Sequence, residues 1–202
     1  MSVAFLGEGI TDEKLVYLIE SGQIPYNVEW LTLRYNYITD VTPLVALTHL
    51  VSLDLSNNRI SDVSPLADMT WLRGVLLSNN EITDITPLGS LSNLRSLNLN
   101  NNQITDMTAV SYLSELTHLF LVRNNISDIT PIANLERLHQ VDLAVNRIYD
   151  LTPLIVNNAR VRWVRLVGNL LLMQEQVDEL TDALPQVVIY DDTSFRALNV
   201  RR

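Results

Sequence analysis

The chain has 202 residues, of which 47% are hydrophobic and 18% are charged, with a formal net charge of −9 and no cysteine. This composition is typical of a well-packed globular protein. It excludes disulfides and thiolate metal sites, and the absence of a long apolar run argues against insertion into a membrane. The acidic balance argues against nucleic acid as a partner, because phosphate binding needs clustered lysine and arginine.

The first 27 residues predict a helical N-terminal cap. Apolar residues recur at helical spacing between Ile10 and Gly22, where Thr11 or Asp12 suits the N-cap and Gly22 ends the helix. Three residues form the expected apolar face: Leu15, Leu18 and Ile19. Residues 1–9 contain a short apolar patch with no positive charge before it, so we expect no signal peptide there.

Residues 28–172 consist of one unit repeated seven times. An asparagine recurs every 22 residues, and after 23 at the last step, always in the frame L-x-x-L-x-L-x-x-N-x-I or a close variant. The seven asparagines are Asn36, Asn58, Asn80, Asn102, Asn124, Asn146 and Asn169. The period of two predicts a short strand with its leucines inward, and successive strands stacking in parallel. The asparagine lies where the chain turns, and its amide can satisfy backbone groups that the turn leaves unpaired.

A second constant segment, I-[ST]-D-[VI]-[ST]-P-L, follows most of the asparagines and predicts a short helical turn. Its aspartate, or the serine or threonine before the proline, can cap that turn, and the proline suits the first position. The aspartates form a column: Asp40, Asp62, Asp84, Asp106, Asp128 and Asp150. A calcium ladder is the alternative interpretation, but calcium takes six to eight oxygen ligands from glycine-containing loops. We expect backbone N–H groups to satisfy these carboxylates, with no metal and no cofactor.

Residues 173–192 predict a C-terminal cap made of a helix and a strand. The helix spans 174–184 and is ended by Pro185, and a last strand spans 187–190. Its inward residues are Val177, Leu180, Ala183 and Leu184. Asp191 and Asp192 would discourage edge-to-edge pairing with another molecule. Residues 193–202 form a tail with three arginines, and we expect all four segments to belong to one structural domain.

The 22-residue unit with its I-[ST]-D-[VI]-[ST]-P-L segment resembles the internalin-type leucine-rich repeats of bacterial surface proteins. The resemblance implies an α/β fold, a right-handed leucine-rich-repeat solenoid with a curved parallel sheet and short 3₁₀ or helical turns on its convex side. It also implies that the concave sheet binds a protein partner, and that the protein acts at the cell surface or is secreted. The residues alone leave the location and the oligomeric state open.

Positions between the inward leucines should line the concave face. In the last three coils they gather apolar side chains beside basic ones, namely Phe120, Val122, Ala144, Val145, Trp163 and Val167 beside His118, Arg123 and Arg165. Aromatic and arginine side chains dominate protein-binding hot spots, and exposed apolar patches mark interaction sites. The predicted partner-binding residues are Trp30, Tyr35, Leu76, His118, Phe120, Val122, Arg123, Trp163 and Arg165.

Two other interpretations compete with protein binding. Ser96, His118 and Asp142 fall on consecutive coils and could form a catalytic triad, but an open sheet supplies neither an oxyanion hole nor a pocket that excludes water. We therefore predict that the protein is not an enzyme. The second alternative is a rigid scaffold or spacer segment of a larger assembly, which would make contacts through its caps or convex face. Covering of the apolar patch by the protein's own tail would favour the spacer.

Overall fold

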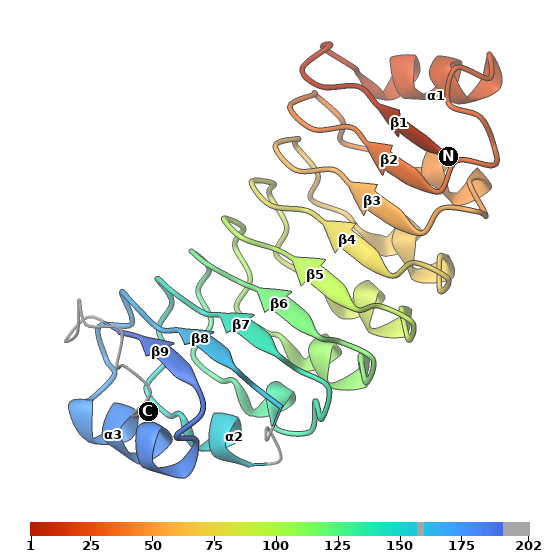
Figure 1. Ribbon diagram of the computed structural model, residues 1–202. Coiled ribbons are helices and arrows are strands. Elements are labelled where there is room, and N and C mark those ends of the chain that lie inside the picture. The colour runs from red at the N-terminus through yellow and green to blue at the C-terminus, as the bar shows by residue number, and fades with distance from the viewer. Residues whose placement is uncertain (157–159, 192–202) are drawn as a thin grey trace.

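The computed structural model describes residues 1–156 and 160–191, and it contains one parallel sheet of nine strands in chain order (Figure 1). The strands are β1 (Ser2–Ala4), β2 (Trp30–Thr32), β3 (Ser52–Asp54), β4 (Gly74–Leu76), β5 (Ser96–Asn98), β6 (His118–Phe120), β7 (Gln140–Asp142), β8 (Trp163–Arg165) and β9 (Val188–Tyr190). Equivalent repeat positions pair directly, as in Leu53 with Val75. The predicted leucine-rich-repeat solenoid with a curved parallel sheet is therefore confirmed.

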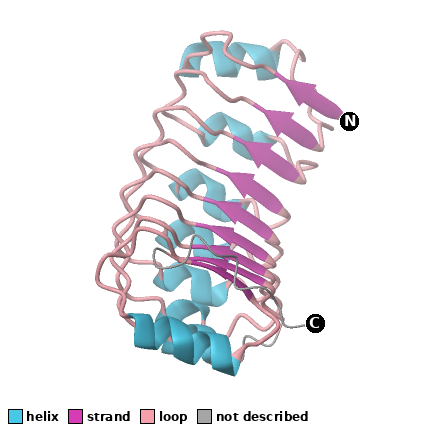
Figure 2. Cartoon of the chain, turned by 60° about the vertical axis from the view of Figure 1, so that its left-hand side comes forward, coloured by secondary structure: helices cyan, strands magenta, loops and turns pink. Residues whose placement is uncertain are grey.

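Short helical turns lie on the side of the coils opposite the strands, as Figure 2 shows. Five are 3₁₀ helices: Thr42–Ala46, Ser64–Asp68, Thr86–Ser90, Thr108–Tyr112 and Thr130–Ile132. The sixth is a four-residue α-helix, α2 (Thr152–Ile155), in the one coil that is a residue longer. The proline was expected at the first position of these turns, but it is the second residue, after the Ser or Thr that begins each of them.

The core is a continuous stack of inward leucines, isoleucines and valines between the sheet and the convex turns. It extends without interruption from Ile10 in the N-terminal cap to Ile189 in the last strand. The strand leucines and the isoleucine after each asparagine are essentially inaccessible, as with Leu97, Leu99 and Ile104. Because each coil buries its apolar residues only against its neighbours, the outward strand positions stay available on one continuous face.

The N-terminal cap contains the expected helix, α1 (Asp12–Glu20), with Thr11 at its N-cap. The Thr11 side chain accepts a hydrogen bond from the Lys14 N–H, and the three predicted apolar residues of the helix are buried. Strand β1 was not predicted. Residues 2–4 lack the leucine-and-asparagine frame, and only their pairing with β2 extends the sheet by one strand.

The C-terminal cap contains α3 (Gln174–Ala183) followed by β9, close to the expected ranges. Val177, Leu180 and Leu184 are buried, but Ala183 is exposed, contrary to expectation. Asp191 is also buried, so it cannot act as an exposed charge that protects the sheet edge. Asp192 and the tail 193–202 lie outside the described residues. No helix within the described part of the chain is long and apolar enough to cross a bilayer.

Candidate protein-binding face

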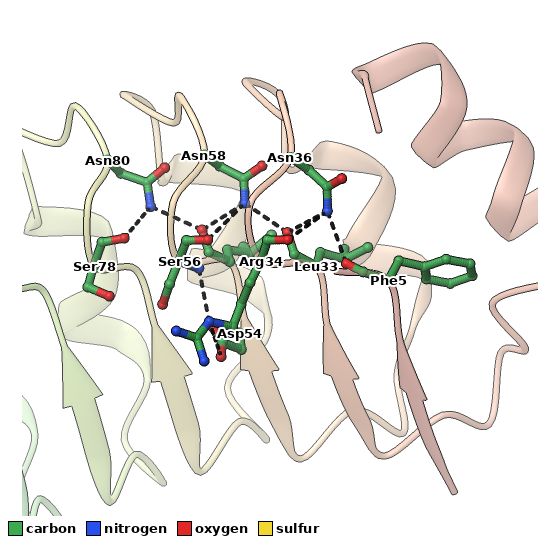
Figure 3. A network of polar contacts seen from close by, with 10 residues as sticks. Phe5, Leu33, Arg34, Asn36, Asp54, Ser56, Asn58, Ser78 and Asn80 are labelled. Atoms are coloured by element: carbon green, nitrogen blue, oxygen red, sulfur yellow. Dashed lines mark hydrogen bonds and ion pairs between the residues drawn. The ribbon is translucent and has the colours of Figure 1, made fainter. Parts of the chain in front are cut away.

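The asparagines of successive coils bind one another's backbone and set the spacing of the face. The Asn58 side-chain N–H₂ donates to the carbonyls of Leu33 in the preceding coil and Leu55 in its own, both at 2.9 Å. Its side-chain oxygen accepts from the Ile38 N–H at 3.1 Å. Figure 3 shows the bonds donated by the side-chain N–H₂ groups of Asn36, Asn58 and Asn80. Each buried amide binds backbone groups, as the sequence indicated, and it also joins two coils, which was not predicted.

The residue before each asparagine adopts a left-handed backbone conformation. The six non-glycine examples have φ between 54° and 60°: Tyr35, Asn57, Asn79, Asn101, Arg123 and Val145. Asparagine and glycine tolerate this conformation, whereas a β-branched residue is an outlier there. The side chains of Tyr35, Arg123 and Val145 therefore stand on the rim where the strands end, rather than on the flat of the sheet.

The aspartate column is satisfied by backbone N–H groups, as expected. Asp84 Oδ1 accepts from the Thr86 N–H at 2.8 Å, and the other five aspartates make the same bond two residues ahead. The capping assignment was wrong in detail, because the N-cap position is the intervening residue, such as Ile85, with no side-chain bond. These bonds stabilise the turns and use one oxygen of each carboxylate.

Acid should weaken the solenoid through this column. Two hydrogen bonds from the residue two positions ahead lower the pKa of four column aspartates from 3.8: Asp62, Asp84, Asp106 and Asp128. The larger effect comes from the side-chain hydroxyl, and the smaller from the backbone N–H, of Ser64, Thr86, Thr108 and Thr130. A lowered folded-state pKa contributes stability above the unfolded value that is lost as pH falls through the folded one. We expect Tm to fall as pH drops below about 4.

Replacing these four aspartates by asparagine keeps an acceptor oxygen but removes the titration. The expected result in a thermal-unfolding series from pH 6 to pH 2.5 is a shallower fall of Tm. The matched control replaces four exposed carboxyls outside the column by their amides: Asp68, Glu81, Glu136 and Glu179. An equally shallow fall in the control would show that general charge repulsion, and not the column, governs acid stability.

The predicted binding residues fall into two groups along the face. Trp30 and Tyr35 are exposed at the N-terminal end, on β2 and the turn after it, and Leu76 lies partly exposed on β4. The others belong to coils five and seven. Trp30 is on β2 and His118 is on β6, so three strands lie between them, and the structure does not bring the two groups together.

We call six side chains on or directly after β6, β8 and β9 the C-terminal patch, and β7 lies between its two aromatic pairs: His118, Phe120, Val122, Trp163, Arg165 and Tyr190. His118 and Phe120 stack with ring centroids 6.5 Å apart, and Trp163 meets Tyr190 at 5.8 Å. Tyr190 was missed, although the register Arg165 to Tyr190 puts it on the same face. Ala144 was expected on this face, but it is completely buried.

An ion pair lies in the middle of the C-terminal patch. The Arg165 guanidinium lies 3.4 Å from Asp142, whose carboxylate is buried and also accepts from the Ala144 N–H at 3.2 Å. Burial raises the pKa of Asp142, and the Ala144 bond and Arg165 oppose that rise. Removing Arg165 alone would leave a buried carboxylate without its counter-charge, so this arginine also helps to hold the shape of the patch.

The geometry opposes the catalytic-triad interpretation. His118 Nδ1 is 2.8 Å from Thr117 Oγ1 in its own strand segment, and Asp142 is engaged by Arg165 and Ala144. Asp142 therefore does not orient His118, as a triad requires. Among the residues that the structure describes, no three histidine, aspartate or glutamate side chains gather into a possible metal site.

Comparisons with known proteins agree with this architecture. A family described as leucine-rich repeats (2 copies) matches residues 26–68 and 70–112. The structure resembles an internalin, inlF, of Listeria monocytogenes with 34% identity and a TM-score of 0.74 over 86% of this chain. This chain spans 50% of that one. A leucine-rich-repeat protein of Leptospira interrogans matches 81% of this chain with 22% identity and a TM-score of 0.76, and the match covers 43% of that protein. At this identity the likeness shows the fold alone. A sequence search of curated proteins finds no match.

Internalin C2 of Listeria monocytogenes has 34% identity to this chain and a TM-score of 0.63. The match covers 82% of this chain and 80% of internalin C2. Likeness at this level over most of both chains extends to the repeat type and not only to the general fold. The protein belongs to the leucine-rich-repeat proteins of the internalin type.

Proposed function

We propose that the protein binds a macromolecular protein partner through its concave sheet face, with the C-terminal patch at the centre of the contact. The single observation that carries this proposal is the presence of two aromatic pairs, one on β6 and one on β8 and β9, at positions where the repeat places solvent-facing residues. Domains of this family typically mediate protein binding, which supports the same role.

The chemistry of the patch suits an anchor for a protein surface. Phe120 and Trp163 are half-buried and each packs against a neighbouring ring, so part of each side chain stays accessible to a partner. Rigid aromatic side chains of this kind lose little conformational entropy on binding. Hot spots are likewise enriched in tryptophan, tyrosine and arginine and surrounded by contacts that exclude water.

The test is a comparative capture experiment with immobilised protein and extracts of candidate host or partner cells. Replacing both Phe120 and Trp163 by alanine should weaken retention of the specific partner at least tenfold, because each anchor contributes more than about 1 kcal/mol. Quantitative mass spectrometry of the retained proteins measures the effect, and circular dichroism and Tm verify the fold.

The matched control removes two exposed aromatic rings from elsewhere, with Tyr17→Ala on α1 and Tyr112→Ala on the convex side. The partner should remain bound to this control. A partner captured equally by the folded patch variant and by the wild type would place binding outside the C-terminal patch and contradict the proposal.

One observation favours the alternative of a scaffold or spacer. The turn after β8 exposes Leu170, Leu171 and Met173 by 90%, 63% and 68%, although earlier coils bury an isoleucine at the position of Leu171. This apolar stretch lies at the end of the stack, where a neighbouring module of a larger assembly could pack. If Leu171→Ser and Met173→Ser abolished capture while the patch variant retained it, the spacer would be the better description.

A further inference from the structure

Charge is segregated between the two sides of the solenoid. The sheet-side segment of each coil runs from the residue before its first inward leucine or valine to the left-handed turn, giving 27–35, 49–57, 71–79, 93–101, 115–123, 137–145 and 160–168. These segments contain eight arginines and four carboxylates, a net charge of +4 in a chain of −9. The aspartate column lies on the other side. The sheet side is therefore basic although the molecule is acidic.

The few carboxylates on this side are largely neutralised by neighbouring arginines. Arg34 lies 3.5 Å from Asp54, a contact drawn in Figure 3, and Arg165 lies 3.4 Å from Asp142. Glu115 is paired with Arg137 in the same way. The fourth carboxylate, Glu29, belongs to the first coil, far along the stack from the C-terminal patch. By this count the surplus positive charge lies on coils three, four and seven, whereas coils five and six are neutral.

Backbone hydrogen bonds stack the residues that directly precede the strands into a row that contains three arginines. The Arg73 N–H donates to the Val51 carbonyl, Arg95 to Arg73, and Thr117 to Arg95, at 2.8 to 2.9 Å. The row continues through His139 to Arg162 with bonds of the same length. We call Arg73, Arg95, His139 and Arg162 the basic edge. All four are exposed, and they immediately precede β4, β5, β7 and β8, so they lie along the edge where the strands begin.

Arg73 and Arg95 are the two arginines of the basic edge that lie on adjacent coils. These coils are about 4.8 Å apart, and neither arginine has a carboxylate partner within the described ranges. Arg123, on the rim where the strands end, likewise has no acidic partner in the part of the chain that the structure describes. Arginines without an acidic partner in the described residues thus lie on both edges of the face: Arg73 and Arg95 where the strands begin, and Arg123 where they end. The C-terminal patch lies on the later strands of the same face.

We infer that the segment bound by the concave face is an acidic protein segment with apolar or aromatic anchors, whose carboxylates contact the basic edge at Arg73 and Arg95. This partner chemistry presupposes the protein-binding role proposed above and specifies it. Opposite charges across an interface steer association and exclude wrongly charged partners. The aromatic rings favour a protein over a phosphate or sulfate polymer, because such polymers need a continuous cationic track, which Thr117 interrupts at the coil after Arg95.

A displayed library of random dodecapeptides, selected against the folded full chain, tests this inference directly. The expected clones are enriched in aspartate and glutamate together with aromatic residues. Synthesised clones should bind Arg73→Glu/Arg95→Glu about tenfold more weakly than the wild type at 50 mM salt, and this difference should shrink at 500 mM because exposed charges are screened. Binding is measured by fluorescence anisotropy.

The matched control is Lys14→Glu/Arg59→Glu, which changes the net charge equally. Lys14 is on α1, and Arg59 follows the turn at the opposite edge, over the Tyr37 ring. Affinity for the acidic clones should be unchanged. Enrichment of neutral or basic peptides, equal losses in both charge variants, or binding of heparin or oligo-dT but of no acidic peptide would overturn the inference.

Phe120→Ala/Trp163→Ala separates this inference from the proposed function. Loss of peptide binding in both the patch variant and the arginine variant supports the two together. Acidic clones that need the arginines but bind the patch variant normally would support the partner chemistry and remove the patch from the contact. Clones that need the patch but not the arginines would support the patch and overturn the acidic partner.

Discussion

Replacing Asn102 by alanine should lower the free energy of unfolding by about 3 to 5 kcal/mol, among the largest effects of any single substitution in the chain. Asn102 is central in the stack and buried. Its side-chain N–H₂ donates to the carbonyls of Leu77 and Leu99, each at 3.0 Å, and its oxygen accepts from the Ile82 N–H at 3.0 Å. Alanine therefore leaves the buried Ile82 N–H unsatisfied, at a cost of about 1 to 3 kcal/mol. It also removes one of the two side-chain donors to each carbonyl, which Asn80 and Asn124 still bind, at about 0.5 to 1.5 kcal/mol per lost bond.

Chemical denaturation monitored by circular dichroism measures this loss, with Gln103→Ala as the control. Gln103 is the next residue and is exposed, so its replacement should change stability by less than about 0.5 kcal/mol. Because coils interact only with their neighbours, the loss should also appear as faster amide exchange in the coils on both sides of Asn102. A loss below about 1 kcal/mol would show that water replaces the amide and that the asparagine stack does not fix the coil spacing.

The repeat explains why most of the fold could be predicted from the sequence. A leucine or valine recurs at the position of Leu97 in every coil, so the inward orientation inferred for one strand applies to all the repeat strands. Features outside the frame were missed for the same reason. Strand β1 has no leucine-and-asparagine frame, and Ala183 lies on a cap helix whose rotation depends on packing rather than on the repeat.

The candidate site was predictable only where the period of two applies. The period of two correctly predicted that Phe120 and Trp163 are accessible, but it also placed Ala144 on the accessible face, where this small side chain is completely buried. The basic edge was missed because the residue before each strand belongs to neither the inward nor the outward set. Only the backbone bonds from Arg73 to Arg95 and beyond show that these residues form a row.

The left-handed turn after β8, in coil seven, carries the second large expected effect: Gly168→Ala should destabilise the protein by about 2 to 4 kcal/mol. Gly168 has a φ of +81°, a conformation that costs an L residue about 1 to 2 kcal/mol. An added Cβ would also lie 3.0 Å from Val145 Cγ2 and 3.2 Å from Val145 Cα. The second contact is with backbone, so rotation of the valine side chain cannot relieve it.

Val145 is the reason why this position differs from the earlier coils. It is a β-branched residue at φ 56° and is 44% exposed, so burial does little to offset its strained backbone. Val145→Asn, which installs the residue found at Asn57, Asn79 and Asn101, should therefore raise stability by about 1 kcal/mol. Denaturant midpoints of the single variants measure both effects.

A double-mutant cycle then separates strain at each residue from the contact between them. Val145→Gly removes Cγ2 but leaves the Val145 backbone where it is, so it should recover only part of the loss caused by Gly168→Ala. Full recovery would mean that side-chain crowding alone requires glycine at this turn, and no recovery would mean that the left-handed backbone alone does. Partial recovery, with a coupling energy of about 1 kcal/mol, is the result that the distances predict, because a side-chain atom and a backbone atom both approach the missing Cβ.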